Sequence, residues 1–537
     1  MRFIEKCIGV FSPEAAFKRT LAVEKTKMLS QQMGIIRGGQ TYTGASNKRS
    51  LKDWFTHDLD ANSSILTDLP LLRSRSQDLY NNSPAAAGAI KNIKTNVIGV
   101  GLLMRSVPDS EYIGLSDDES QAWSDIVERE FEMWSDNALF CDYNGQQSFK
   151  EMQRLIILSQ QISGDVFVLM PWVNNKNSIY DLKLKIVDAA RVCNPNDAPD
   201  NKQIAGGVEY DDYGRPIAIH IRTPHPGNQL DFSVAKWDRI EIWGKESGRR
   251  NVLHIMEHER IDQARGVPAL TPVIETVKQI SKYSEAEINA AVINAVLSVF
   301  IERSNDDSAP GGSNYEEDDD SPKPWEESEQ SLGSGTLIDL APGEKANMVS
   351  AVRPSSQFDP FFLATMKQIG MALEIPFEVL IKHFSSSYSA ARAALLEANK
   401  MYREKRSFFV DKFCKPVFEE FLTEAIIKGR VNAPGFLSDL AIRSAYLKTA
   451  WTGPAPGQLD PIKEYEASNK ACEYGFSHRS KETAELNGLD FEDVIKAQAR
   501  EKHLMKKHGV ELQTSIYQPI ADDKSTNSDD DNNKEIN

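Results

Sequence analysis

The chain has 537 residues, several times the commonest domain length, so we expect more than one structural unit. Hydrophobic residues make up 40% and aromatic residues 9%, which is enough for a sizeable core and excludes a wholly disordered protein. Lysines and arginines number 62 against 78 acidic residues, and the formal net charge of −16 excludes a generally basic coat protein for nucleic acid.

Most of this negative charge is local. Residues 304–331 hold ten acids and one lysine, and residues 521–537 hold six acids and two lysines. The rest of the chain is therefore almost balanced. We expect a solvated acidic loop at 304–331 and a disordered acidic tail, because neither segment can bury a core.

Cysteines and apolar runs indicate the compartment. The five cysteines are too scattered for a disulfide framework or a cysteine-based zinc site, which suits a reducing cytosol. Residues 1–11 are apolar only in part, because Glu5, Lys6 and Gly9 interrupt them, so we expect no signal peptide. No apolar run reaches the length of a membrane span.

The first part of the chain predicts an arm followed by helices. Residues 1–59 show mixed charge with several glycines. A long helical pattern over 66–98 is punctuated at Pro84, which is tolerated as the first residue of a new helix. Two more helices are predicted at 117–137 and 148–163. In the former, an apolar stripe contains Ile126, Phe131 and Trp134.

The pattern changes to sheet over 164–257. Residues 182–187 alternate with period two, and the turn at 211–215 contains the Asp and Gly that a hairpin requires. After this region, a helix is predicted over 272–300. A second hairpin is predicted around residues 341–344, between strands at 336–340 and 346–350.

Helices return in the last third of the chain. They are predicted at 358–373 and 389–428, with a kink or break at Pro416, and in pieces as far as 508. The long helix alternates Glu397 and Glu404 with five basic residues. This pattern favours a solvated face or ion pairs between subunits over a stripe that binds phosphate. The basic residues are Arg392, Lys400, Arg403, Lys405 and Arg406.

Two short motifs suggest enzymes but lack the required context. His254, Glu257 and His258 fit the HxxEH pattern of one class of zinc peptidases, in which a helix brings both histidines to one face. Here His254 ends a predicted strand, so we favour two ordinary histidines. The glycines at 39 and 44 have the spacing of a phosphate-binding loop, but the lysine of that motif is missing. We therefore expect no ATPase site, no catalytic residues, no metal and no cofactor.

Eight strings in register resemble the portal protein family of lambda-like tailed bacteriophages over about residues 60–500. No single string is decisive. They lie at 73–84 with 96–101, 186–191 with 193–195, 207–216, 265–268, 375–376 with 388–392, 451–454, 459–463 and 485–490.

The resemblance implies an α+β, portal-type fold with a mixed α/β wing, a helical stem, a small clip that contains β-structure and a helical C-terminal crown. The implied boundaries follow the order of parts in the family. They are an N-terminal arm at 1–59, a wing at 60–268, a stem helix at 269–302, a clip at 303–357 that includes the acidic insertion 304–331, a second stem helix with the tunnel loop at 358–388, a long helix with the crown at 389–510, and an acidic tail at 511–537.

The resemblance also implies a function. Such proteins form a ring, usually of twelve subunits, at one capsid vertex, where double-stranded DNA passes without sequence specificity through the axial channel during packaging and ejection. The implied partners are the terminase large subunit, head–tail connector proteins, and major capsid and scaffold proteins, with no membrane. The protein would be assembled in the host cytoplasm and reside in the virion. A near-neutral lining suits this role, because a basic bore would hold the DNA by its phosphates.

The same order of parts places residues 374–388 near the channel. We expect Lys382, His383, Ser385, Ser386 and Ser387 to face the passing duplex. An alternative stays open, because the apolar residues of this segment could instead pack beneath the wing. These are Phe377, Val379, Leu380, Ile381 and Phe384.

Two other functions stay open as alternatives. One is a zinc peptidase that uses the HxxEH string at 254–258, which would require stoichiometric zinc. The other is a monomeric scaffold or adaptor protein that recruits basic partners with its acidic tail. A mass measurement in solution distinguishes a monomeric scaffold or adaptor protein from a ring.

Overall fold

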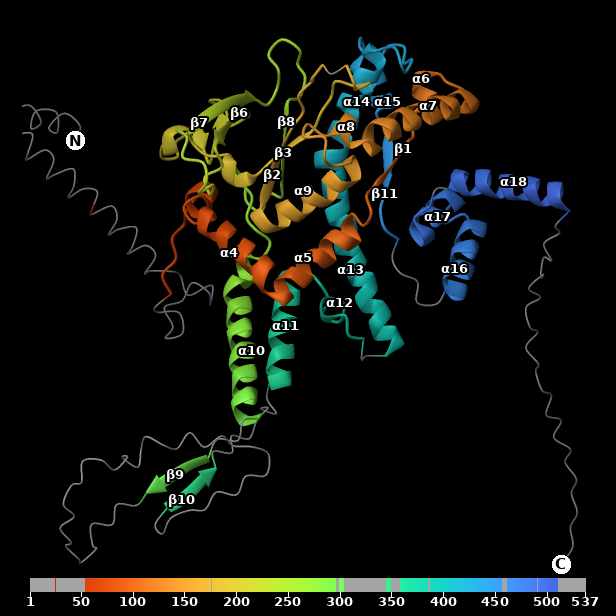
Figure 1. Ribbon diagram of the computed structural model, residues 1–537. Coiled ribbons are helices and arrows are strands. Elements are labelled where there is room, and N and C mark those ends of the chain that lie inside the picture. The colour runs from red at the N-terminus through yellow and green to blue at the C-terminus, as the bar shows by residue number, and fades with distance from the viewer. Residues whose placement is uncertain are drawn as a thin grey trace, which may run out of the picture. The chain divides into compact units, whose positions relative to one another are not determined.

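The computed structural model describes residues 25, 54–174, 176–295, 299–303, 344–348, 358–384, 387–455, 461–489 and 491–509 (Figure 1). The chain divides into two compact units, Met1–Ser64 and Ile65–Asn537. In the first unit, the carboxylate of Asp60 accepts hydrogen bonds from the backbone N–H groups of Asn62 (3.1 Å) and Ser63 (3.2 Å) at the start of helix α3 (Ala61–Ile65). The acidic segment 304–331 and the tail 511–537 lie outside the described residues.

The second unit begins with the expected helices. The long pattern forms α4 (Leu69–Asn82) and α5 (Pro84–Val97), which are separated at Ser83 because Pro84 starts a new helix. Helices α7 (Asp117–Asp136) and α9 (Phe149–Ser163) each begin with a capping box, formed by Ser116 with Glu119 and by Ser148 with Glu151. Two short helices flank α7, namely α6 (Ser110–Ile113) and α8 (Ala138–Cys141).

The apolar stripe expected on α7 is correct except at one residue. Phe131 and Trp134 are buried, together with Trp123 and Val127. Ile126 is 45% exposed, because it lies at the edge of the stripe, roughly 95° around the helix axis from its centre. The described burial therefore follows the 3.6-residue period closely.

The sheet region is antiparallel, as expected for 164–257. One sheet has the order β3–β2–β8, formed by Lys185–Val187, Asp165–Leu169 and Val252–Met256. In the other, β4 (Ile204–Ala205), β5 (Val208–Tyr210), β6 (Pro216–Thr223) and β7 (Lys236–Glu241) follow in sequence. Two 3-10 turns, Ala189–Arg191 and Pro195–Asp197, connect the two sheets.

Strand β2 separates two apolar clusters. Val166 and Val168 belong to the larger cluster, which also contains residues of α5, α7, α9 and the helices after residue 358. Phe167 points to the opposite face and belongs to a smaller cluster with residues of β5, β6 and β8. This division follows from the alternation of side chains along a strand.

The middle of the chain differs from expectation. A third 3-10 turn, Thr271–Val273, precedes α10 (Ile274–Ala295), which ends before residue 300, and Val299–Arg303 forms strand β9. The strand predicted near 346–350 exists as β10 (Glu344–Met348), and it pairs with β9 in antiparallel register. The strand predicted at 336–340 lies outside the described residues. The prediction of helix at 299–300 was wrong, because these residues belong to β9.

The last third is helical. Helices α11 (Phe358–Ala372), α12 (Phe377–Ile381) and α13 (Tyr388–Phe409) are followed by a π-helical turn, Val410–Cys414, and α14 (Lys415–Ile427). Pro416 lies in the first turn of α14, directly after the π turn. The missing N–H of proline is tolerated there, and π turns accommodate such local irregularities.

A C-terminal set of elements completes the second unit. Helix α15 (Leu440–Tyr446) leads into strand β11 (Thr449–Thr452), which pairs with β1 (Leu103–Ser106). Helices α16 (Pro461–Glu473), α17 (Arg479–Asn487) and α18 (Phe491–His508) follow. The mixture of helix and sheet confirms the α+β class. Over the described residues, no helix combines the length and the apolar character needed to cross a membrane.

Candidate functional site

The segment that sequence analysis placed near a channel is an elbow between α11 and α13. Its tight start depends on Gly370, whose carbonyl accepts a hydrogen bond from the Ile375 N–H at 2.9 Å. A Cβ atom at position 370 would lie 2.7 Å from the carbonyl oxygen of Ile375. Glu374 adopts a left-handed conformation with φ of +58° in this turn, and Pro376 then precedes α12. The chain thus reverses within four residues of the end of α11.

Helix α12 carries both the buried and the exposed part of this segment. Ile375, Val379 and Leu380 are buried in the larger cluster, and Phe377 and Ile381 pack against it. The alternative of apolar packing is therefore correct for four of its five residues, Phe377, Val379, Leu380 and Ile381, whereas Phe384 is 48% exposed.

The described candidate channel residues lie on the exposed side of the elbow. Lys382 ends α12 in a left-handed conformation with φ of +56°, and its side chain is exposed. The backbone N–H of His383, also exposed, donates to the carbonyl of Glu378 at 3.1 Å. The hydroxyl of Ser387 caps α13 by accepting from the Ala390 N–H. Ser385 and Ser386 lie outside the described residues.

One side chain of α5 holds the elbow against the body. The amide Nδ2 of Asn92 donates to the carbonyl oxygen of Val379 at 3.4 Å. Its Oδ1 accepts a hydrogen bond from the hydroxyl of Tyr402 on α13. Asn92 is buried, so these bonds satisfy polar groups that have no access to bulk water.

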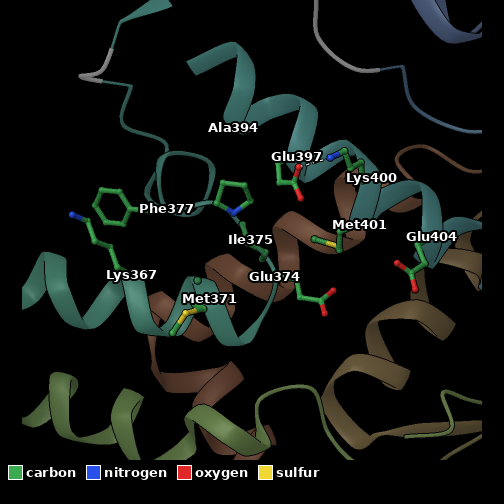
Figure 2. Close-up of a pocket in the computed structure, with 12 residues that line it drawn as sticks. Lys367, Met371, Glu374, Ile375, Phe377, Ala394, Glu397, Lys400, Met401 and Glu404 are labelled. Carbon is green, nitrogen blue, oxygen red and sulfur yellow. Dashed lines mark hydrogen bonds and ion pairs between the residues drawn. The ribbon is translucent and has the colours of Figure 1, made fainter. Parts of the chain in front are cut away.

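A pocket of about 620 Å³ lies in the inner angle of the elbow (Figure 2). Its apolar wall includes Met371, Ile375, Phe377 and Met401. Charged residues form the remaining wall. They are Lys367, Glu374, Glu397, Lys400 and Glu404.

Figure 2 shows Phe377 and Lys367 on one side of this pocket and Glu404 on the other. The Lys367 ammonium lies 5.2 Å from the centre of the Phe377 ring, and Lys400 pairs with Glu397 at 2.6 Å. The lining residues include no serine, threonine, cysteine or histidine.

A second site, which sequence analysis missed, surrounds the buried carboxylate of Asp165 at the start of β2. Arg73 of α4 donates to Oδ1 at 2.7 Å, and Arg265 donates to Oδ2 at 2.6 Å and to Oδ1 at 3.2 Å. The Gly266 N–H completes the set at 3.2 Å. The positive charge of the two guanidinium groups overcomes the cost of burial and holds the pKa of Asp165 well below its usual range.

Arg265 joins distant parts of the chain at this site. In addition to Asp165, its guanidinium donates to the carbonyls of Val192 (2.6 Å), Gly206 (2.6 Å) and Ala189 (2.7 Å). All five N–H groups of the side chain thus have acceptors, which is the condition for burying an arginine at tolerable cost.

Two glycines allow this close packing. Gly164, with φ of +90°, lies so near Gly266 that a Cβ atom at position 164 would be 2.4 Å from the carbonyl oxygen of Gly266. A Cβ atom at position 266 would be 2.1 Å from the carbonyl oxygen of Gly164. Neither position can therefore hold another residue without a shift of the backbone.

The HxxEH string has no metal-binding geometry. His254 lies in strand β8, where its ring stacks on Phe167 at 4.1 Å between centroids and its Nε2 lies 3.1 Å from Oδ2 of Asp165. Burial lowers the pKa of His254, against the opposing influence of Asp165. Across the ranges that the structure describes, no group of three or more His, Cys, Asp or Glu side chains is placed to hold a metal ion.

The basic residues of α13 have different environments. Lys400 pairs with Glu397 on the same helix, Arg403 with Glu485 at 3.4 Å, and Lys405 with Glu257 at 3.4 Å. Arg406 is partly buried and donates to the carbonyls of Val97 (2.9 Å), Asn96 (2.8 Å) and Pro454 (3.2 Å). Arg406 therefore connects α13 to the end of α5 and is not part of a solvated face.

Comparisons with known proteins agree on one family. The family model "Phage portal protein, lambda family" matches residues 47–406. Portal protein B of Escherichia phage lambda is 24% identical over 492 residues, covering 88% of this chain and 90% of its own length. The portal protein of Escherichia phage N15 is 24% identical over 493 residues, with 88% and 90% coverage.

Solved structures with a similar chain come from gene transfer agent particles. A chain from the virion of a native particle has a TM-score of 0.42 and 15% identity, and covers 78% of this chain and 93% of its own length. A chain from the neck of a native particle, computed with C12 symmetry, has a TM-score of 0.41 and 14% identity, with 78% and 93% coverage.

Proposed function

Because the chain belongs to the lambda family of phage portal proteins, we propose that it forms a ring of twelve subunits at one capsid vertex. The family model spans two thirds of the chain, and the match to the two curated portal proteins extends over 88% of it. The family expected from the sequence is thereby confirmed, and with it the expectation of a structural protein rather than an enzyme.

The ring would be a conduit for double-stranded DNA during packaging and ejection. DNA translocation consumes energy, and no segment of the chain combines the glycines and the lysine of a phosphate-binding loop. The motor is therefore a separate protein in this proposal, the large subunit of a terminase. Head–tail connector, major capsid and scaffold proteins would be further partners, and the ring would assemble in the host cytoplasm before it becomes part of the virion.

The parts of the chain fit this role in the order that the family has. Residues 60–268 would form the wing, and helices α10 and α11 would form the stem, with the clip at 303–357 between them. Two observations support this division: α10 follows directly after the sheet region, and β9 and β10 pair with each other just beyond the two helices. Residues 389–510 would then form the long helix and the crown.

The elbow after α11 would bring Lys382 and His383 to the channel. In favour of this assignment, both side chains are exposed while the apolar residues of α12 are buried beneath them. The bond from Asn92 to Val379 would hold the exposed end of α12 at a fixed distance from α5. A fixed loop that exposes one or two cations per subunit can touch phosphates without adhering strongly to the DNA.

A mass measurement of the purified full-length chain tests this proposal. A ring of twelve copies has twelve times the 60.1 kDa of the chain, about 720 kDa, and light scattering distinguishes this from a monomer. A monomer at micromolar concentration, also in the presence of scaffold protein, would contradict the proposal and favour an adaptor protein. Zinc bound in a 1:1 ratio and required for peptide cleavage would favour the peptidase.

A further inference from the structure

Helix α18 carries a stripe of basic side chains on one face. The stripe consists of Lys496, Arg500, His503 and Lys507, which have the spacing i, i+4, i+7 and i+11. At 3.6 residues per turn, these four positions lie within roughly 60° of one another around the helix axis. Lys502 and Lys506 also belong to α18 but point to a different side of it.

Among the described residues, the first member of the basic stripe is the one with an ion pair to the body of the protein. Lys496 lies 3.3 Å from Oδ1 of Asp125 on α7, and one turn earlier Glu492 accepts a hydrogen bond from Gln121 at 2.7 Å. The side chains of Arg500, His503 and Lys507 are exposed, and none of them forms an ion pair within the part of the chain that the structure describes. The stripe thus begins at α7 and continues as an open row of basic side chains.

Helix stability and packing do not explain this row. Basic residues in the last turn of a helix stabilise its dipole, which accounts for Lys506, Lys507 and His508. That effect is confined to the last turn and does not extend to Arg500 or Lys496. Packing is not the reason either, because no residue of α16, α17 or α18 for which burial is described, a set that leaves out 493 and 504, is buried.

We propose that the basic stripe of α18, which belongs to the proposed crown and not to the elbow assigned to the channel, binds the phosphate backbone of double-stranded DNA. The inference rests on the proposed function, which makes duplex DNA the polyanion that the ring meets. The row extends about 16 Å along the helix, and a duplex presents one negative charge per about 1.7 Å of its axis, so several phosphates lie within reach. Such contact does not depend on base sequence.

This chain has two acidic segments that could compete for the stripe, 304–331 and 521–537, and the tail is the nearer of the two to α18 in the sequence. Residues 521–537 contain six acids and begin shortly after α18 ends. Duplex DNA is the better match, because the tail also contains two lysines, whereas DNA presents a continuous row of phosphates and releases counterions when it is neutralised.

Two matched double variants of the full-length ring test the proposal. Arg500→Glu with Lys507→Glu reverses two charges of the stripe, and Lys502→Glu with Lys506→Glu makes the same change in charge on another side of the helix. Binding of a 30-base-pair duplex of random sequence is measured by fluorescence anisotropy over a series of salt concentrations. The stripe variant is expected to lower affinity on the order of 50-fold at 0.1 M salt, and to reduce the salt slope by about 2. The control is expected to change affinity less than about threefold.

Other outcomes overturn the proposal. Equal losses in both variants would mean that the ring attracts DNA by net charge alone, without a specific row. If the stripe variant binds like the parent, DNA does not bind at this face. In that case, carbodiimide cross-links from Lys507 to the acids of 521–537 in the parent ring would identify the tail as the occupant.

The mass of every variant is measured alongside its DNA affinity. Rings that bind DNA independently of the stripe contradict only this inference. A parent chain that forms no ring contradicts the proposed function, whatever its affinity for DNA. A variant with Arg500→Lys and Lys507→Arg keeps the charges of the row, and it is expected to bind within about twofold of the parent.

Discussion

The hydroxyl of Tyr402 on α13 donates a hydrogen bond to the side-chain oxygen of Asn92 on α5, although 310 residues separate them in the sequence. Asn92 also donates to the Val379 carbonyl and accepts from the amide of Asn96 at 3.1 Å. One buried amide thus connects α5, α12 and α13, and thereby determines where the elbow and its exposed Lys382 lie.

We predict that Asn92→Ala lowers the free energy of unfolding by about 1–3 kcal/mol, because it removes the acceptor of the buried Tyr402 hydroxyl and a donor to the Val379 carbonyl. Tyr402→Phe should cost less, since Asn96 still donates to the oxygen of Asn92. Urea unfolding measures both. Asn82→Ala removes an exposed Asn from α4 and should change stability by less than about 0.5 kcal/mol. Equal losses at residues 82 and 92 would contradict the connecting role of Asn92.

We predict a larger loss for Asp165→Asn, about 3–5 kcal/mol, because it leaves Arg73 and Arg265 without their counter-charge in the interior. The matched control is Asp411→Asn, where the carboxylate pairs with Lys415 at 2.7 Å on an exposed surface and the expected loss is below about 1 kcal/mol. If the variant at 165 cannot be purified, its soluble fraction beside that of Asp411→Asn gives the comparison. Similar stability of both variants would show that the buried site contributes little.

We predict that Gly164→Ala prevents folding or costs more than about 3 kcal/mol, because its Cβ atom would overlap the backbone of Gly266. Gly214→Ala is the control. It has a similar φ of +83°, but no atom lies within 4 Å of the added Cβ, so only the conformational strain of about 1 kcal/mol applies. Thermal unfolding of the two variants separates strain from overlap. If both variants lose the same stability, overlap with the backbone of Gly266 is not the cause of the loss in Gly164→Ala.

We predict that the protein loses stability as the pH falls below about 6.5. Burial lowers the pKa of His254 in the folded chain, so in this range the unfolded chain binds a proton at residue 254 and the folded chain does not. His254→Gln should reduce this slope. The contribution of Asp165, whose pKa is depressed, persists down to its ordinary value of 3.8 and is lost below it. Urea unfolding from pH 7 down to pH 3, in steps of one unit, measures both. An unchanged slope between pH 5 and 7 in the variant would exclude His254 as the cause.

We predict that Lys382→Glu leaves ring formation unchanged and alters stability by less than about 0.5 kcal/mol, because the side chain is exposed. DNA packaging or retention should change, and more so at low salt, where exposed charges are less screened. Lys245→Glu, at a position with 80% side-chain exposure in the sheet region, is the control for charge. A variant at 382 that packages and retains DNA like this control at every salt concentration would mean that Lys382 is not near the channel.

Local signals in the sequence predicted most helices correctly. Pro84 and Gly164 mark real boundaries, and the Ser148–Glu151 pair forms the capping box that starts α9. The strand Val299–Arg303 was missed because a short apolar run fits a helix and a strand equally well. Its partner strand starts about 40 residues later, beyond the reach of any local pattern.

The elbow and the site around Asp165 show what the sequence cannot reveal. Ile375-Pro376 indicated the end of a helix, but not that Val379 would be buried while Lys382 stays exposed. Arg73, Asp165 and Arg265 are about 100 residues apart from one to the next, and each alone resembles a surface charge. The signal available was the place of Arg73 and Arg265 in the strings that resemble the family, because Asp165 lies in none of them. The structure explains three of these strings. Arg73 and Arg265 both donate to the carboxylate of Asp165, and Arg265 also donates to the carbonyl of Ala189.

The pairing of β1 with β11 affects how the chain is made. Leu103 lies opposite Thr452, so β1 leaves the ribosome about 350 residues before its partner exists, an interval of tens of seconds or more at ordinary rates of synthesis. During this time the edge of β1 lacks its cognate strand, and β11 of an earlier, neighbouring chain could occupy it by domain swapping. Copies translated from one messenger RNA are therefore the ones most exposed to misassembly, and slower initiation should raise the yield of correctly closed subunits.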